Sequence, residues 1–79
     1  MYVYLIQSES NPDKRYIGLT KNLNQRLEEH NRGKSPHTSK FTPWVTKVAI
    51  WFEDKARAAA FEQYLKKGSG HAFAKRHLW

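Results

Sequence analysis

Two short runs of aromatic and β-branched residues near the N-terminus most constrain what this chain can fold into. They are YVYLIQ, residues 2–7, and RYIG, residues 15–18. Residues of these types favour strands, and the segment between the runs, SESNPDK, consists mostly of turn formers. The two runs therefore predict an antiparallel hairpin, in which Tyr4 and Tyr16 lie on neighbouring strands.

The segment NLNQRLEEHNRG, residues 22–33, predicts a helix that follows the hairpin. Asn22 is a suitable N-cap with Gln25 in the capping-box position, and Gly33 suits the C-terminal end. Four residues have the i, i+3, i+4, i+7 spacing of a single helix face: Leu23, Arg26, Leu27 and His30. The inward face of this helix is therefore expected to carry an arginine and a histidine.

A third strand is expected in the middle of the chain. The segment WVTKVAIWF, residues 44–52, carries β-branched and aromatic residues throughout, and a polar, basic loop over residues 34–43 precedes it. With two helices after this strand, the order of elements is β-β-α-β-α-α. This order predicts an α+β fold, a three-stranded and mainly antiparallel sheet flanked by helices, in one domain over residues 1–79.

The two C-terminal helices are predicted from composition and from glycine positions. Residues 55–67, KARAAAFEQYLKK, contain several alanines, which are strong helix formers. An apolar stripe is formed by Ala58, Phe61 and Leu65. Glu62 lies at the edge of this stripe. Gly68 and Gly70 are expected to break the chain before a last short helix over residues 71–78.

The charge of the chain narrows the classes of function. Fourteen Lys and Arg against seven Asp and Glu give a net charge of +7 and a pI near 9.9, which favours polyanionic partners, above all nucleic acid. The alternatives are a charge that serves solubility or a basic ribosome-associated fragment. The absence of cysteine excludes disulfides and thiolate chemistry. The N-terminal apolar run is too short to span a membrane, and we expect a soluble, cytoplasmic protein.

Glu62 is the first candidate for chemistry. It is the only acidic residue from position 55 onward, among six lysines and arginines. A lone carboxylate in a basic field suits Mg²⁺, which often uses one or two carboxylates and keeps its remaining waters. The alternative is a solvated helix residue that pairs with Lys66 at i+4.

Arg26 and the two hairpin tyrosines are the next candidates. An arginine on an apolar stripe suits phosphate oxygens, although it could instead snorkel past neighbouring leucines or pair with an acid. Tyr4 and Tyr16 could present two hydroxyls at one site and relay a proton, although ordinary aromatic packing across a hairpin is favoured for each of them taken alone.

The histidines and the basic loop give weaker indications. The spacing of the four histidines matches no zinc pattern, and only His30 stands apart, because it shares a helix face with Arg26. The loop carries basic and aromatic residues that could contact a sugar-phosphate backbone or stack on a base: Lys34, His37, Lys40, Phe41 and Trp44. The alternative is a mobile, solvated loop.

Taken together, the order and spacing of these motifs resemble the GIY-YIG nuclease domain. The matching elements are YVY at residues 2–4, YIG at 16–18, LNQRLEEH at 23–30 and the helical Glu62. The likeness covers nearly the whole chain, and the ending YLKKGSGHAFAKRHL is similar to that of small stand-alone members. In this family the glycine lets the backbone approach the site and the arginine follows eight residues later, a spacing that Gly18 and Arg26 keep.

The resemblance implies five site residues. Tyr4 and Tyr16 correspond to the tyrosines of the two triplets, Arg26 to the arginine that supports the scissile phosphate, and His30 to a position usually occupied by His or Tyr. Glu62 corresponds to the single metal-binding glutamate. The chain departs from the family pattern in three places. The first triplet lacks its glycine, and the residue directly after YIG is leucine, where some repair nucleases carry lysine. An asparagine that some members place after the glutamate has no clear counterpart.

The implied function is that of an endonuclease that hydrolyses phosphodiester bonds in DNA, including structured or damaged DNA, with one Mg²⁺ or Mn²⁺ ion. DNA is expected in preference to RNA, DNA repair is the expected setting, and a protein partner for targeting stays open. Eight basic residues are expected to bind nucleic acid: Lys14, Arg15, Lys34, Lys40, Lys66, Lys67, Lys75 and Arg76. The alternatives are a non-catalytic nucleic-acid-binding module of the same fold and a partner-binding domain whose charge is incidental.

Overall fold

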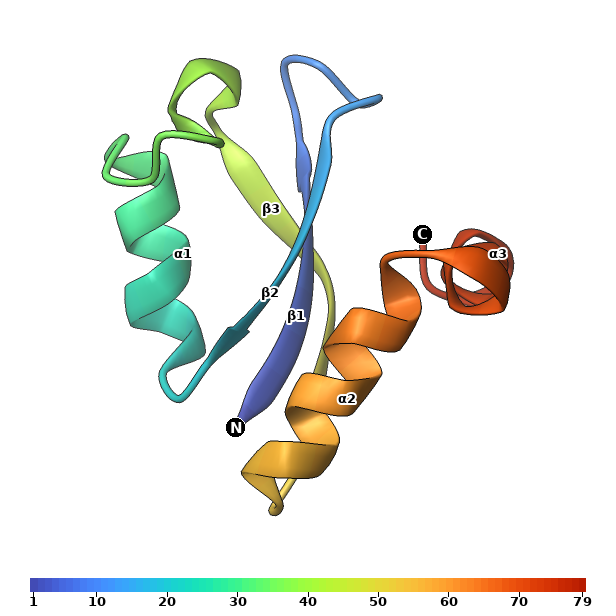
Figure 1. Cartoon of the computed structure of the whole chain (residues 1–79). Helices are drawn as coiled ribbons and strands as arrows, with labels where there is room; N and C mark the ends of the chain where they lie inside the picture. The colour runs from blue at the N-terminus through green and yellow to red at the C-terminus, as the bar shows by residue number, and fades with distance from the viewer.

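The computed structural model describes residues 1–79 and contains the predicted elements in the predicted order (Figure 1). The elements are β1 (Tyr2–Ser8), β2 (Arg15–Thr20), α1 (Leu23–Asn31), a 3₁₀ turn (Ser39–Phe41), β3 (Trp44–Trp51), α2 (Lys55–Leu65) and α3 (Gly68–His77). The expected α+β fold with a β-β-α-β-α-α order is therefore confirmed.

The sheet has the order β2-β1-β3, and both strand pairs are antiparallel. The hairpin of β1 and β2 pairs Tyr4 with Gly18 and Ile6 with Tyr16. Because side chains alternate between the faces of a strand, these four residues share one face of the sheet. β1 lies in the centre, and β2 is an edge strand that exposes one side to solvent.

Helices cover both faces of the sheet, with α1 on one face and α2 and α3 on the other (Figure 1). On the α2 face, Val3 and Leu5 of β1 pack with a core cluster that the two C-terminal helices complete: Ala58, Leu65 and Ala74. On the α1 face, the buried residues are Tyr4, Ile6 and Trp44, and Leu23 and Leu27 of α1 pack against them. The helix face predicted for α1 is therefore the face that meets the sheet.

Helices α1 and α2 begin where the sequence predicts. The side chain of Asn22 accepts a hydrogen bond from the backbone N–H of Gln25 at 3.0 Å, as expected of an N-cap. Asp54 accepts from the N–H groups of Ala56 and Arg57 at the start of α2. None of the helices combines the length and the apolar character needed to cross a bilayer.

The C-terminal region differs from the prediction at Gly70. α3 begins at Gly68 and runs through Gly70, so the expected break at Gly70 is wrong. Gly68 has a φ of 62°, which favours glycine and marks the turn between α2 and α3. Gly70 is required for close packing, because a β-carbon there would lie 1.7 Å from the carbonyl oxygen of Tyr64 in α2.

Candidate active site

The two tyrosines of the hairpin lie together on the α1 face of the sheet. Their ring centroids are 6.2 Å apart, with Tyr4 fully buried and Tyr16 half-buried. Between them lies Gly18, where an added β-carbon would be 2.5 Å from the Tyr4 hydroxyl oxygen and 2.9 Å from Cε1 of Tyr16. Only glycine leaves room for both rings at this point of the edge strand.

α1 contributes an arginine and a histidine to the same cluster. Arg26 Nε donates a hydrogen bond of 3.3 Å to the hydroxyl of Tyr4, and Nη1 forms an ion pair of 3.0 Å with Glu29. His30 is fully buried, and its ring centroid lies 5.8 Å from that of Tyr4 and 5.0 Å from that of Tyr16. The structure therefore brings Tyr4, Tyr16, Arg26 and His30 together around Gly18.

The hydrogen bonds of His30 define its tautomer. Its Nδ1 lies 2.7 Å from Oγ1 of Thr38, and this hydroxyl donates to the carbonyl of Ser35 at 3.5 Å. Because the threonine hydroxyl has one proton, it accepts from Nδ1–H of the histidine. Nε2 is then unprotonated and accepts from the hydroxyl of Tyr4 at 2.8 Å. These hydrogen bonds form a connected series that runs from Arg26 through Tyr4, His30 and Thr38 to the backbone.

Burial and charge shift the pKa values of three of these groups. Burial raises the pKa of Tyr4 to about 12, against the opposing effect of the hydrogen bond from Arg26. Burial also lowers the pKa of His30 to about 4, and the positive charge of Arg26 adds to this shift. The hydrogen bond to Tyr4 raises the pKa of Arg26 above its usual value. At neutral pH Tyr4 and His30 are therefore uncharged, and Arg26 is the one cation of the cluster.

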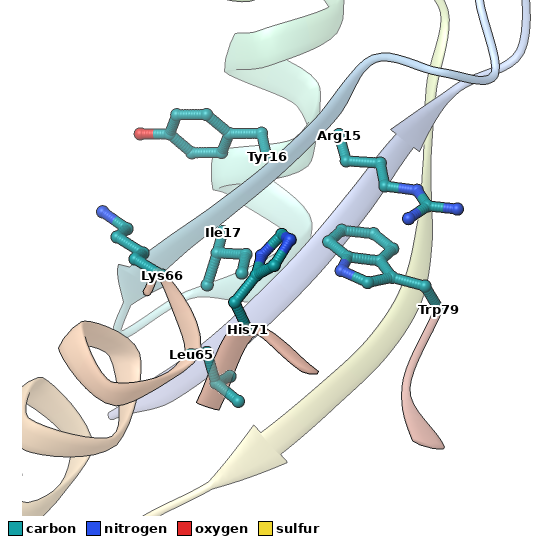
Figure 2. Close-up of a pocket in the computed structure, with 7 residues that line it drawn as sticks. All are labelled: Arg15, Tyr16, Ile17, Leu65, Lys66, His71 and Trp79. Carbon is teal, nitrogen blue, oxygen red and sulfur yellow. The ribbon is translucent and has the colours of Figure 1, made fainter. Parts of the chain in front are cut away.

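Glu62 lies on α2, on the other side of the sheet from α1. Only 6% of its surface is exposed, so the expectation of a solvated residue is wrong, whereas the ion pair with Lys66 is present. Its second carboxylate oxygen accepts a hydrogen bond of 3.1 Å from Gln63. Lys66 and Tyr16 line the same pocket at the edge strand, whereas Glu62 does not line it and contacts none of the four residues of the α1 face (Figure 2).

The chemistry of Glu62 fits a single divalent cation. No group of three or more His, Asp or Glu side chains gathers anywhere in the structure, so a cage made wholly of protein ligands is absent. A buried carboxylate with a lysine as its present counter-charge can instead provide one ligand. Mg²⁺ accepts such a site when waters and substrate phosphates supply the other oxygens.

The eight basic residues predicted to bind nucleic acid are all exposed: Lys14, Arg15, Lys34, Lys40, Lys66, Lys67, Lys75 and Arg76. Two of them lie over aromatic rings. Lys14 Nζ is 5.2 Å from the ring centroid of Phe41, and the guanidinium of Arg15 is 5.0 Å from that of Trp79. Their role in nucleic-acid binding stays a prediction.

Trp44, the first residue of β3, cannot stack on a base, contrary to the prediction. Trp44 is 3% exposed, and its Nε1 donates a hydrogen bond of 2.8 Å to the carbonyl of Thr38. Trp44 thus anchors the loop from inside, while Thr38 orients His30. Thr38 was not predicted from the sequence, because nothing in a polar loop marks its pairing with a histidine. Glu29 could have been found from its i+3 spacing to Arg26.

Comparison with known proteins assigns the chain to a class of enzyme domain. The family model of the GIY-YIG catalytic domain matches residues 1–76. The chain therefore belongs to the GIY-YIG catalytic domain family, which confirms the resemblance found in its motifs. The three-stranded antiparallel sheet with its flanking helices agrees with this assignment.

Two curated relatives make the similarity more specific. The chain is 34% identical over 83 residues to the structure-specific endonuclease subunit SLX1 of Scheffersomyces stipitis, and 35% identical over 83 residues to the same subunit of Debaryomyces hansenii. Each alignment covers 96% of this chain but only 24% and 23% of the relatives, so the chain spans about a quarter of their length. No solved structure matches with significance. The relatives agree with the predicted class of enzyme, an endonuclease.

Proposed function

We propose that this domain is a divalent-metal-dependent endonuclease that hydrolyses phosphodiester bonds in DNA. The single observation that carries the proposal is the cluster of Tyr4, Tyr16, Arg26 and His30 around Gly18 in a member of the GIY-YIG catalytic domain family. A binding module would need neither a buried tyrosine–histidine pair nor the buried carboxylate of Glu62. The names of the relatives favour structured DNA as the substrate.

The hydrogen bonds suggest different roles for the two tyrosines. The proton of Tyr4 is held by His30, and a pKa near 12 makes Tyr4 a poor proton acceptor at neutral pH. Tyr16 is half-buried, and its hydroxyl points away from the sheet beside the pocket in Figure 2. We therefore assign Tyr16, once its phenol proton has been released to solvent, as the phenolate that accepts a proton from the attacking water, and Tyr4 as the residue that positions Arg26 and His30.

Arg26 stabilises negative charge on the phosphate in the transition state. Its ion pair with Glu29 and its hydrogen bond to Tyr4 fix the guanidinium before substrate binds, so little reorganisation is needed. Glu62 holds one Mg²⁺ or Mn²⁺ ion, which polarises the phosphate and stabilises the leaving oxygen when it is bound. Lys66 pairs with this carboxylate in the structure, so its ammonium group and a cation at Glu62 would compete for the same group.

The relatives are named as subunits, and this supports a protein partner for targeting. A small domain with one active site cuts one strand in one encounter, and a partner would choose where it cuts. We propose DNA in preference to RNA as the substrate, and DNA repair as the setting. The cytoplasmic location expected from the sequence stays a prediction.

The test is a cleavage assay on supercoiled, linear, single-stranded, flapped and branched DNA, with matched RNA, in Mg²⁺, Mn²⁺ or EDTA. We expect metal-dependent cutting of DNA that Arg26→Ala reduces by about 10²–10³-fold. Arg32→Ala is the matched control, because this exposed arginine near the end of α1 pairs only with Glu28. Salt-sensitive binding without cutting by any variant would favour the non-catalytic module instead.

A further inference from the structure

A pocket beside Tyr16 is lined mostly by residues that the proposed chemistry does not use. Its volume is about 320 Å³, which lies at the lower end of the range of small-molecule sites. It lies against the edge strand β2 and is closed by the C-terminal part of the chain (Figure 2). The residues that line it are Arg15, Tyr16, Ile17, Leu65, Lys66, His71 and Trp79.

The lining of the pocket is apolar and aromatic inside and basic at its edges. Ile17 and Leu65 form an apolar floor, and Trp79 adds an aromatic wall. Two basic side chains stand at its edges, Arg15 and Lys66, of which Lys66 also pairs with Glu62, and no acidic residue lines the pocket itself. An apolar and aromatic interior with cationic edges suits a ligand that carries a flat ring and a phosphate, rather than a metal ion or an aliphatic chain.

The Arg15 side chain is already arranged for such a ligand. Its guanidinium lies 5.0 Å from the ring centroid of Trp79, and this contact holds a planar group with free N–H donors at the pocket. Bases of unpaired nucleotides stack on guanidinium planes and aromatic rings, and their phosphates pair with the same donors. In Figure 2 the imidazole of His71 extends into the space between Ile17 and Trp79.

We infer that this pocket binds an unpaired nucleotide of the substrate, with its base against Ile17, His71 and Trp79 and its phosphate near Arg15 and Lys66. The inference deepens the proposed function, because Tyr16 belongs both to the pocket and to the active-site cluster. A nucleotide in the pocket would therefore adjoin the phosphate that is cut. A base stacked inside a duplex cannot enter without first leaving the stack. The pocket thus selects nucleic acid in which bases next to the cut are unpaired.

The test needs neither metal nor cleavage, so it is independent of the proposed activity. The ¹⁵N-labelled chain is titrated in EDTA with the single strand (dT)₆, with a blunt hairpin duplex of the same charge, and with inorganic phosphate. NMR shifts of the Trp79 indole and the His71 ring report the pocket, and the Trp51 indole reports a surface away from it. We expect (dT)₆ to shift the pocket signals selectively, and the duplex and phosphate to leave them nearly unchanged.

His71→Ala and His77→Ala form a matched pair for this titration. Both histidines are exposed on α3, but His77 contacts Phe73 and does not line the pocket, so both variants should fold. We expect His71→Ala to weaken (dT)₆ binding by about tenfold, the size of one lost stacking contact, and His77→Ala to bind like the wild type. Arg15→Ala should weaken it as well, with Lys47→Ala as the control for a lost exposed charge.

Three results would overturn the inference. They are equal pocket shifts with duplex and single strand, shifts produced in full by inorganic phosphate alone, and wild-type affinity for (dT)₆ in the His71→Ala and Arg15→Ala variants. A chain that cleaves no DNA under any condition but shows the expected titration would refute the proposed nuclease and retain the nucleotide pocket. A chain that cleaves DNA but fails the titration would retain the nuclease and refute the pocket.

Discussion

The hydroxyl oxygen of Tyr4 lies 2.8 Å from Nε2 of His30, and both side chains are buried between α1 and the sheet. The contact joins the first strand of the chain to the end of the first helix. It leaves the histidine neutral and the tyrosine protonated, because each group is cut off from water and each satisfies the other. The pair therefore links the stability of the fold to pH.

His30 is expected to make the domain less stable in mild acid. Its pKa is about 4 in the folded chain and 6.5 in the unfolded chain, so between these values the unfolded state binds the extra proton. Stability is complete above about pH 6.5 and falls as the pH decreases toward 4. The total loss is up to about 3 kcal/mol, since one pKa unit corresponds to about 1.4 kcal/mol. Denaturant unfolding across pH 4–8 measures it.

A pair of variants isolates this contribution. His30→Gln should have a flatter dependence of unfolding free energy on pH, even if it is less stable at every pH. His77→Ala, which removes an exposed histidine from α3, should keep the wild-type slope. If both variants keep that slope, His30 is protonated as easily in the fold as in the unfolded chain, and the neutral buried histidine is refuted.

Thr38 is expected to orient His30 through the hydrogen bond at Nδ1. Thr38→Val keeps the shape of the side chain and leaves Nδ1–H without a buried acceptor, which should cost about 1–3 kcal/mol. Thr38→Ser restores the hydroxyl and should recover most of the loss. The ¹⁵N shifts of the His30 ring give a separate readout: a change of tautomer in the valine variant supports the role, and an unchanged tautomer argues against it.

Gly18 is expected to be essential for activity for a steric reason. Alanine at this position would drive its β-carbon to 2.5 Å from the Tyr4 hydroxyl, and one of the two tyrosine rings must move. Gly18→Ala should therefore lose cleavage by at least about tenfold, because a shift of about 1 Å near reacting groups can cost much more. Gly68→Ala is a suitable control. It strains a turn with φ of 62° but has nothing within 4 Å of the added carbon.

The two glycine variants should differ in which property they lower, the melting temperature or the cleavage rate. Gly68→Ala should lower the melting temperature and leave the cleavage rate of the folded protein unchanged. Gly18→Ala should lower the rate at temperatures where circular dichroism still reports a folded domain. Wild-type cleavage by folded Gly18→Ala would mean that the two tyrosines need not occupy the positions seen here.

The two tyrosines are expected to respond differently to the loss of a hydroxyl. Tyr16→Phe removes the proposed proton acceptor, and rates should fall by about 10²–10⁴-fold with little change in stability. Tyr4→Phe leaves Nε2 of His30 and Nε of Arg26 without their shared partner, so it should cost stability as well as rate. Measurements of the cleavage rate and of the unfolding free energy for both variants test this assignment of roles. The opposite pattern would exchange the two roles.

Much of the fold could be predicted because the local signals agree with the tertiary structure. The hairpin, the cap at Asn22 and the face of α1 all follow from residue spacing and were confirmed. The prediction at Gly70 was wrong because a glycine can either end a helix or allow two segments of backbone to pack closely together. Its reason for being glycine lies in α2, at the carbonyl of Tyr64, and no local pattern contains that contact.

Four of the five predicted site residues come together in the structure, Glu62 lies apart from them, and the arrangement of the four could not be predicted. The spacing from Gly18 to Arg26 and the family resemblance brought together residues that the structure also brings together on the α1 face. The interactions that define their protonation could not be predicted, because Thr38 reaches His30 from a loop without periodicity. The burial of Glu62 was also missed, since a position at the edge of a helical stripe does not reveal how far a neighbouring strand covers it.

The most direct test of the proposed nuclease is the cleavage rate of Glu62→Gln beside Glu53→Gln, on the best DNA substrate, over a series of Mg²⁺ and Mn²⁺ concentrations and with EDTA. Glutamine keeps the size of Glu62 and removes the charge that would hold the cation, whereas Glu53 is exposed before α2. We predict that Glu62→Gln loses at least about 10² in rate while it remains folded, and that Glu53→Gln and the wild type cut equally and only with metal. Cleavage by Glu62→Gln at the wild-type rate, with the same metal dependence, would contradict a metal-dependent nuclease centred on this carboxylate.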